Sequence, residues 1–275
     1  MDWIQTILFG LVSGLTEILP VSADAHQAIL TKLFGQTPAP LLQLIVHAAV
    51  LIALSQLCGE QIGQLLREQR IMSAPRSRRK RQPDMIKVLD MRLLRTASVF
   101  LALGFFAYPY TYAWRLDLHF IAPVMVLNGI LLYIPMHMAT GNKDSRSMSR
   151  MDAVLLGLSG ILAVIPGISR VGVITSAGIT RGADREQSLS WSLLLCIPAL
   201  IILLGFDIYG IMLSGFGSLS LTVLLQYLVA AAAAYGAANA GIRILRFMAV
   251  GVGFSGFAYY CWGAALFSFI LYLTV

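Results

Sequence analysis

Charged residues are scarce in this sequence. Asp, Glu, Lys and Arg make up 12% of its 275 residues and 58% are apolar, whereas a soluble globular domain is about 25% charged. The mean hydropathy is +0.78, and several stretches of about 20 residues carry few or no charges, the length that a helix needs to cross a bilayer. This composition excludes a soluble globular domain and predicts an all-α, polytopic membrane protein.

The sequence also lacks paired cysteines and the common metal and nucleotide motifs. Its three cysteines, Cys58, Cys196 and Cys261, are scattered among apolar residues without a paired spacing. We therefore expect small buried side chains rather than disulfides or metal ligands. The chain has neither a His/Cys cluster with metal-ligand spacing nor a glycine-rich nucleotide-binding loop, so no motif points to those functions.

Two apolar segments, 3–35 and 151–180, are interrupted near their middles by Pro20 and by Pro166-Gly167. Proline removes a backbone donor and glycine relaxes the helix, so each segment is predicted to form two half-helices joined by a turn. A half-helix of about 15 residues rises about 22 Å, which is less than a hydrocarbon core of about 30 Å. Both segments are therefore predicted to be re-entrant hairpins. The other apolar stretches predict six membrane spans, at 40–58, 93–113, 120–139, 189–213, 219–239 and 248–273.

Basic residues are distributed unevenly over the connections between these segments. With both hairpins re-entrant, one side of the membrane receives 17 of the 20 Lys and Arg residues, and the other keeps only Lys32 and Arg115. The positive-inside rule makes the basic side cytoplasmic. The connection 59–92 is predicted to be a basic cytoplasmic loop. Its run Arg76–Arg81 is expected to be solvated near anionic headgroups, and no nucleic-acid partner is expected.

The order of elements repeats along the chain. Residues 1–139 hold a hairpin followed by three spans, and residues 140–275 hold another hairpin followed by three spans. Because each unit crosses the membrane three times, the second is predicted to have inverted topology, with its hairpin entering from the opposite side. Inverted repeats with broken helices are typical of transporter folds and place a site where the half-helix turns meet near the midplane.

The two hairpins share a sequence pattern but differ in charge. The first copy, Ser13–His26, reads SGLTEILPVSADAH, and the second, Ser159–Arg170, reads SGILAVIPGISR. An unpaired guanidinium at the membrane centre costs about 3 kcal/mol or more, so Arg170 is either a counter-ion that locks the hairpins together or part of a site. The Pro166-Gly167 turn leads through Ser169 to a predicted helix N-terminus. This arrangement favours a site for an anion, most naturally a phosphate.

Three side chains of the first hairpin are candidates for the chemistry of this site. Glu17 is a metal ligand or proton acceptor beside the phosphate, or only a counter-ion of Arg170. His26 lies past the Pro20 turn and is a candidate nucleophile, acid or base. Asp24 orients His26, helps to bind a divalent cation, or caps the second half-helix; the residues leave these alternatives open.

Four further polar residues lie within the predicted spans. His47 and His137 have no motif near them, and we expect both to be helix-interface histidines whose hydrogen bonds are satisfied. Asp207 and Asn128 are isolated intramembrane polar groups, and the sequence assigns no role to either.

At the hairpin motifs the chain resembles a known family. Two motifs carry the resemblance: Gly14-Leu15-Thr16-Glu17-x-Leu19-Pro20-Val21-Ser22-x-x-x-His26 and Pro166-Gly167-x-Ser169-Arg170-x-Gly172. The chain resembles undecaprenyl-diphosphate phosphatases of the bacitracin-resistance type, and the resemblance runs nearly from end to end. The resemblance implies a multi-pass enzyme of the bacterial cytoplasmic membrane that hydrolyses undecaprenyl diphosphate to the monophosphate. It would recycle the lipid carrier of peptidoglycan synthesis from a site open to the external side. A divalent cation, Mg²⁺ or Ca²⁺, is implied as cofactor; no oligomeric state is indicated.

The resemblance also implies roles for particular residues. It implies catalytic roles for Glu17, His26 and Arg170, substrate binding by Ser22, Gly167, Ser169 and Arg170, and metal binding by Glu17 with Asp24.

The chain departs from the family's pattern at three polar positions. Ser13 replaces the first acid of an acid-x-x-x-Glu pair, Ala23 replaces a second serine, and Val171 replaces the serine after the arginine. A serine nucleophile at position 23 is thereby excluded, whereas attack by His26, or by water with His26 as base, is not. The departures leave an alternative function open: a non-catalytic or weakly catalytic relative that binds or translocates a polyprenyl phosphate.

Overall fold

The computed structural model describes residues 1–73, 88–139, 141–144, 147–216, 219–250 and 252–274, and these residues form helices and connections without strands. The basic run Arg76–Arg81 lies outside the described residues. The α-helices are α1 (Trp3–Ile18), α2 (Ala23–Phe34), α3 (Pro40–Leu57), α4 (Gly59–Ser73), α6 (Val88–Gly104), α7 (Tyr108–Thr111), α8 (Leu118–Met136), α9 (Arg150–Ile161), α10 (Arg170–Thr180), α11 (Arg185–Ser214), α12 (Leu221–Val250) and α13 (Gly256–Thr274). Short 3-10 helices are η1 (Phe105–Ala107), η2 (Tyr112–Trp114), η3 (Leu162–Val164) and η4 (Val252–Ser255).

Helices long and apolar enough to cross a membrane account for most of the bundle. Among the described residues there are six, within Pro40–Leu57, Met91–Trp114, Leu118–Met136, Arg185–Ser214, Leu221–Met248 and Gly256–Thr274. They correspond one by one to the six predicted spans. The all-α, multi-pass prediction is therefore confirmed.

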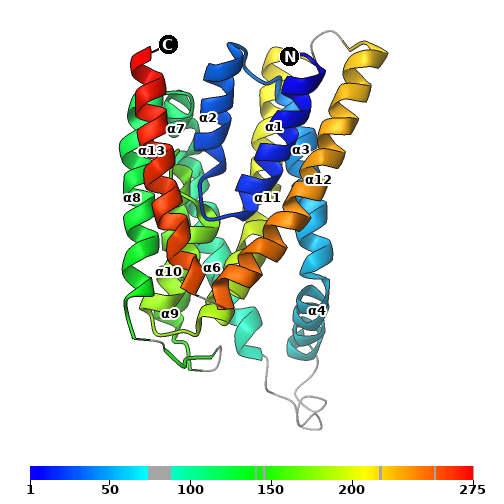
Figure 1. Cartoon of the computed structure of the whole chain (residues 1–275). Coiled ribbons are helices and arrows are strands. Elements are labelled where there is room, and N and C mark those ends of the chain that lie inside the picture. Colours follow the sequence, from blue (N-terminus) through cyan, green and yellow to red (C-terminus); the bar gives the residue numbers. More distant parts are fainter. Residues whose placement is uncertain (74–87, 140, 145–146, 217–218, 251, 275) are drawn as a thin grey trace.

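Both proline-interrupted segments turn back inside the bundle. α1 ends at Ile18 and α2 begins at Ala23, while α9 continues into η3 before α10 begins at Arg170. In Figure 1 the α1–α2 hairpin enters from the end that carries both termini, and the α9–α10 hairpin enters from the opposite end. The inverted symmetry of the two halves stays a prediction.

A positive φ one or two residues after each proline makes the reversal of direction possible. Ser22 has a φ of 67°, and Gly167 has a φ of 107°. Gly167 tolerates this conformation because it has no Cβ, and a Cβ there would also lie 2.7 Å from Cγ1 of Val124. Ser22 is the one non-glycine residue with positive φ among the described residues. Such strain is typical of functional sites.

The boundaries of several helices differ from the sequence prediction. The predicted loop 59–92 begins with the helix α4, and α12 continues past residue 239 to Val250. In α4, Gln, Leu, Glu and Arg are good helix formers, and Ile62 and Leu65 pack against the hydrophobic core. The end of an apolar run indicates where a segment leaves the membrane. The helix itself can continue beyond that point, as α12 does.

Close packing of α1 against α12 anchors the first hairpin. Gly10 and Gly14, one turn apart on α1, face the backbone of Ala230 and Ala234, where an added Cβ would lie 2.3 Å from each carbonyl oxygen. Small residues allow membrane helices to approach this closely. The position of α1, and with it that of Glu17, is therefore set by backbone contact with α12.

Candidate active site

The two hairpin turns meet directly inside the bundle. The hydroxyl of Ser169, at the start of α10, donates a hydrogen bond to the carbonyl oxygen of Leu19 at 3.3 Å and accepts one from the N–H of Gly172. Asn128 of α8 lies between the turns: its side-chain nitrogen donates to the carbonyl of Pro20 at 3.2 Å, and its side-chain oxygen accepts from the N–H of Ser169 at 2.9 Å. The predicted meeting of the turns is present in the structure.

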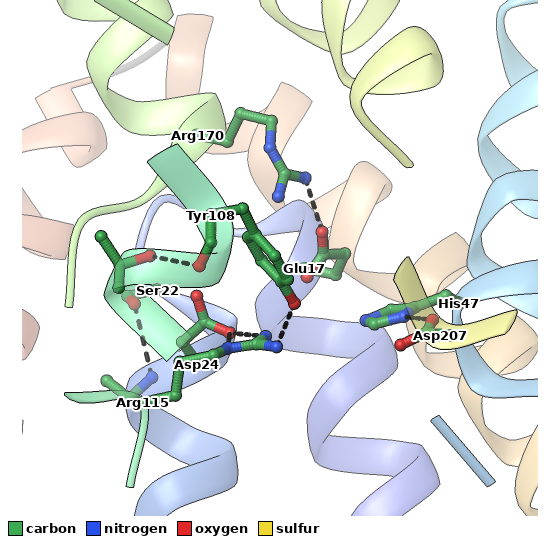
Figure 2. Close-up of polar contacts among 10 residues, drawn as sticks. Glu17, Ser22, Asp24, His47, Tyr108, Arg115, Arg170 and Asp207 are labelled. Carbon is green, nitrogen blue, oxygen red and sulfur yellow. Dashed lines mark hydrogen bonds and ion pairs between the residues drawn. The ribbon is translucent and has the colours of Figure 1, made fainter. Parts of the chain in front are cut away.

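Glu17 and Arg170 form the central ion pair of this region. Nη1 of Arg170 lies 2.7 Å from Oε1 of Glu17, and both side chains are largely buried (Figure 2). The Nε of Arg170 is also buried but has no hydrogen-bond partner. A buried donor without a partner is costly, and here it belongs to a guanidinium at a helix N-terminus, where an anion is favoured. The pair is thus a counter-ion contact that still leaves capacity for an anion.

A second ion pair, Asp24–Arg115, lies close to the first (Figure 2). The guanidinium of Arg115 contacts Oδ1 of Asp24 through Nε, at 3.0 Å, and through Nη2, and its Nη1 donates to the hydroxyl of Tyr108. The sequence placed Arg115 among the few cations of the external side. The structure keeps Arg115 in the connection before α8 and turns its side chain into the bundle, toward the partly buried carboxylate of Asp24, which needs a cation close to it.

A small cavity of about 20 Å³ joins these groups. Its lining includes Glu17, Asp24, His47, Arg115, Ser169 and Arg170. Asp24 and Arg115 also line a larger cavity of about 250 Å³, together with Thr37 and Pro38 of the α2–α3 connection and Tyr112 and Leu116 before α8. In Figure 1 this connection lies at the end of the bundle that carries the termini. We call the two spaces the inner cavity and the vestibule; the Asp24–Arg115 pair is common to both.

His26 lies outside the inner cavity. Its Nδ1 donates to the carbonyl of Ser22 at 2.8 Å, and its Nε2 lies 2.8 Å from the hydroxyl of Tyr260. Because a carbonyl only accepts, Nδ1 carries the proton and Nε2 accepts from Tyr260. His26 lines an apolar groove of about 440 Å³ together with Val12, Leu30 and Phe267. Asp24 and His26, two residues apart on α2, point about 200° apart, which separates the cavity from the groove.

The other predicted substrate-binding residues have backbone roles. Ser22 is the N-cap of α2, and its hydroxyl accepts a hydrogen bond from the N–H of Ala25. Gly167 forms the turn before α10. Neither lines the inner cavity, whereas Ser169 and Arg170 both do. The structure therefore brings Glu17, Asp24, Ser169 and Arg170 together and leaves Ser22, Gly167 and His26 at the edges of that group.

The three positions that depart from the family's pattern lie in or beside the site. Ala23 lines the inner cavity. Ser13 is buried one turn before Glu17, and its Oγ has no hydrogen-bond partner. Val171, next to Arg170, is fully buried. Of these three positions, Ala23 is the one that lines the inner cavity, and the missing serine hydroxyl there makes the cavity less polar than the family's pattern implies.

The donor set offers limited scope for a metal ion. Among the described residues there is no group of three or more His, Cys, Asp or Glu side chains arranged to hold one. Glu17 and Asp24 line the same cavity, but each is paired with an arginine. Mg²⁺ is often bound by one or two carboxylates together with substrate phosphates and water. The residues fit a cation that arrives with a phosphate and do not form an all-protein cage.

Sequence reasoning assigned no part in the site to Arg115, His47, Asp207 or Asn128. Arg115 does lie in a connection and His47 does lie at a helix interface, between α3 and α11, as expected. Asp207 and Asn128 had been assigned no role. In the structure Nδ1 of His47 on α3 lies 2.6 Å from Oδ2 of Asp207 on α11 (Figure 2). The one signal in the sequence was that polar residues within apolar spans are expensive and usually functional; nothing in the spacing paired them.

Comparison with known proteins identifies the family of this chain. The family model described as "Bacitracin resistance protein BacA" matches residues 6–267. The chain is 30% identical to the undecaprenyl-diphosphatase of Desulfosudis oleivorans, over 90% of this chain and 91% of that protein. It is 25% identical to the undecaprenyl-diphosphatase of Methanobrevibacter smithii, over 100% of this chain and 99% of that protein. Because the family model spans nearly the whole chain, including both hairpins, this protein belongs to the bacitracin resistance protein BacA family.

Proposed function

We propose that this protein is an integral membrane phosphatase that hydrolyses undecaprenyl diphosphate to undecaprenyl monophosphate and inorganic phosphate. Membership of the family and the names of its relatives support this activity. The observation that carries the proposal is the buried guanidinium of Arg170, which has an unpartnered Nε and stands beside Ser169 at a helix N-terminus. That combination is suited to a phosphate group.

The parts of the site suggest where each end of the substrate lies. The terminal phosphate is proposed to bind at Ser169 and Arg170, reached when the Asp24–Arg115 contact opens. The prenyl chain is proposed to occupy the apolar groove beside His26, where Val12, Leu30 and Phe267 offer a lipid-like surface. His26 would then act on the substrate from the groove side, close to the lipid-linked phosphate. Ser22 and Gly167 shape the two turns between which the diphosphate fits.

A divalent cation, Mg²⁺ or Ca²⁺, is proposed as cofactor, held by Glu17 and Asp24 together with the substrate. When bound, it would neutralise part of the charge that phosphoryl transfer concentrates on the phosphate oxygens. The protein's own contribution is electrostatic: Arg170 and the N-terminus of α10 hold the terminal phosphate, and Glu17 keeps the guanidinium oriented.

The protein is proposed to lie in the bacterial cytoplasmic membrane with its site open to the external side. The vestibule opens between the α2–α3 connection and the residues before α8. These lie at the end of the bundle with the termini, opposite to the end where α9 begins at Arg150 and α11 at Arg185. The positive-inside rule assigns the basic end to the cytoplasm. Recycling of the peptidoglycan lipid carrier would follow from this orientation.

The departures Ser13, Ala23 and Val171 favour one second candidate, a non-catalytic relative that binds or translocates a polyprenyl phosphate. Purified protein in detergent, given undecaprenyl diphosphate and Mg²⁺, is expected to release inorganic phosphate. Arg170→Ala and His26→Ala are expected to abolish the release, with Arg181→Ala, outside the site, as the control. Unchanged release in either site variant would refute the assigned roles. No release with Mg²⁺ or Ca²⁺, alongside saturable prenyl-phosphate binding that Arg170→Ala removes, would establish the second candidate.

A further inference from the structure

A buried histidine–aspartate pair stands at the wall of the inner cavity. His47 and Asp207 are 3% and 6% exposed, and Nδ1 of His47 lies 2.6 Å from Oδ2 of Asp207. They come from α3 and α11, 160 residues apart in sequence. A buried carboxylate inside a membrane bundle is costly and is a functional candidate by default. A pair that only joined two helices would have no reason to face the cavity, yet His47 lines it.

The contact with Asp207 fixes which nitrogen of His47 is available. A carboxylate accepts, so the proton lies on Nδ1 and the lone pair of the neutral ring lies on Nε2. Among the described residues, no hydrogen bond to Nε2 of His47 is formed. The ring is therefore oriented by a carboxylate on one side and has a free basic nitrogen on the other. This is the arrangement in which a histidine serves as a general base.

The other histidine near the site is arranged differently. Both ring nitrogens of His26 are engaged, one with Ser22 and one with Tyr260, and the ring lines the apolar groove rather than the inner cavity. A water molecule that attacks the terminal phosphate in line must approach from the side opposite to the lipid-linked oxygen. His47 lines the inner cavity, on the side from which this water would approach, whereas His26 lies on the side of the groove proposed for the prenyl chain.

We propose that His47 is the general base of the hydrolysis and that Asp207 is its positioning residue. Nε2 of His47 takes a proton from water as the water oxygen forms a bond to the terminal phosphorus. The bond from that phosphorus to the bridging oxygen breaks, and its electron pair leaves with undecaprenyl monophosphate. The proton on His47 then passes to the released phosphate or to water. This inference rests on the proposed phosphatase function and assigns a base that the sequence did not assign.

Five charged groups surround His47, and they determine how its role appears in a pH profile. Asp207 on α11 contacts it directly. The others, from four different parts of the fold, line the same cavity: Glu17 on α1, Asp24 on α2, Arg115 before α8 and Arg170 on α10. A base must be neutral to accept a proton, so activity is expected to fall at low pH as His47 becomes protonated. That acid limb belongs to His47 only if it disappears when His47 is replaced.

The test compares His47→Gln and Asp207→Asn with the control His137→Gln. His137 sits at the end of α8 and is bonded to the carbonyl of Tyr133 in its own helix. The kcat and KM for undecaprenyl diphosphate are measured from pH 5 to 9, together with inhibition by inorganic phosphate. General-base catalysis contributes about 10²–10⁴-fold. We expect kcat to fall by about 10²-fold or more in His47→Gln and by about 10-fold or more in Asp207→Asn, with KM and phosphate inhibition nearly unchanged.

The acid limb of the pH profile should vanish in His47→Gln and persist, displaced, in Asp207→Asn. A role confined to joining α3 and α11 would lower thermal stability without removing that limb. If His47→Gln fails to fold, the result for Asp207→Asn tests the proposal. A kcat of Asp207→Asn within about threefold of the wild-type value, with the acid limb at the same pH as in the wild type, overturns the proposal. Active wild-type protein with an equally active His47→Gln variant also overturns it and leaves the phosphatase function standing. Wild-type protein that releases no phosphate overturns the phosphatase function itself.

Discussion

The side-chain oxygen of Asn128 accepts a hydrogen bond from the backbone N–H of Ser169 at 2.9 Å. The same amide donates to the carbonyl of Pro20 at 3.2 Å, so one side chain of α8 holds the turn of each hairpin. Asn128 is fully buried. Its position explains how two hairpins that enter from opposite ends of the bundle keep a fixed separation at their tips.

Replacement of Asn128 by leucine should therefore damage stability and activity together. The N–H of Ser169 would be left buried without this partner, at a cost of about 1–3 kcal/mol, and the carbonyl of Pro20 would keep only the weaker contact from Sγ of Cys261 at 3.7 Å. We expect a lower midpoint of thermal unfolding in detergent and at least a tenfold loss of phosphate release. Asn239→Leu is the control, because Asn239 bonds to the carbonyl of Tyr235 within its own helix, α12. Equal behaviour of the two variants would contradict the role of Asn128.

Arg170 should not be replaceable by lysine. Lysine keeps the positive charge but lacks the planar fork that binds Glu17 and a phosphate at once. Loss of one such electrostatic contact typically costs about 10²–10³-fold in kcat, and we expect Arg170→Lys to fall in this range. The matched control is Arg181→Lys, because Arg181 also pairs with a carboxylate, that of Asp152, but lies outside the inner cavity. The kcat of both variants is measured by steady-state phosphate release.

Removal of the metal should abolish activity without altering the fold. Because Glu17 and Asp24 are each paired with an arginine, we expect weak Mg²⁺ binding in the absence of substrate, detectable by calorimetry. Asp24→Asn should raise the Mg²⁺ concentration for half-maximal activity by about tenfold or more, as the loss of a ligand or its support does.

Asp117→Asn provides the control for the metal experiment. Asp117 caps the N-terminus of α8, and asparagine caps a helix about as well as aspartate. Its Mg²⁺ requirement should equal that of the wild type. Full activity of the wild-type protein in excess chelator would be incompatible with the proposed cofactor.

Gly14→Ala should loosen the first hairpin from the bundle. The added Cβ would lie 2.3 Å from the carbonyl oxygen of Ala234, so α1 must move away from α12. Overpacking of this kind costs about 1–3 kcal/mol, and the shift would carry Glu17 away from Arg170. Gly236→Ala on α12 has open space around it and should be neutral or slightly stabilising, because alanine is the better helix former. The two variants are compared by thermal unfolding and by phosphate release. Similar midpoints of thermal unfolding would argue against the close approach of α1 to α12.

The site was only partly predictable from sequence. Glu17, Ser169 and Arg170 were identifiable because each lies in a proline-marked hairpin, and local sequence is enough to place a charge beside a chain reversal. Arg115, His47 and Asp207 were not, because each comes from a span or connection without a motif. Their partners are distant in sequence: Asp24 lies 91 residues from Arg115, and Asp207 lies 160 residues from His47.

By itself the sequence determined the helical, multi-pass architecture and the two hairpins. Apolar runs and prolines act on the backbone locally, so their consequences do not depend on what lies across the bundle. Tertiary structure decided which charges meet. A buried carboxylate or guanidinium must find a partner wherever the packing of helices brings one close, and that packing depends on contacts such as Gly14 against Ala234. Helix packing brought Arg115 into the site and paired His47 with Asp207. It also decided what each face of α2 meets, so that Asp24 lines the inner cavity and His26 lines the apolar groove.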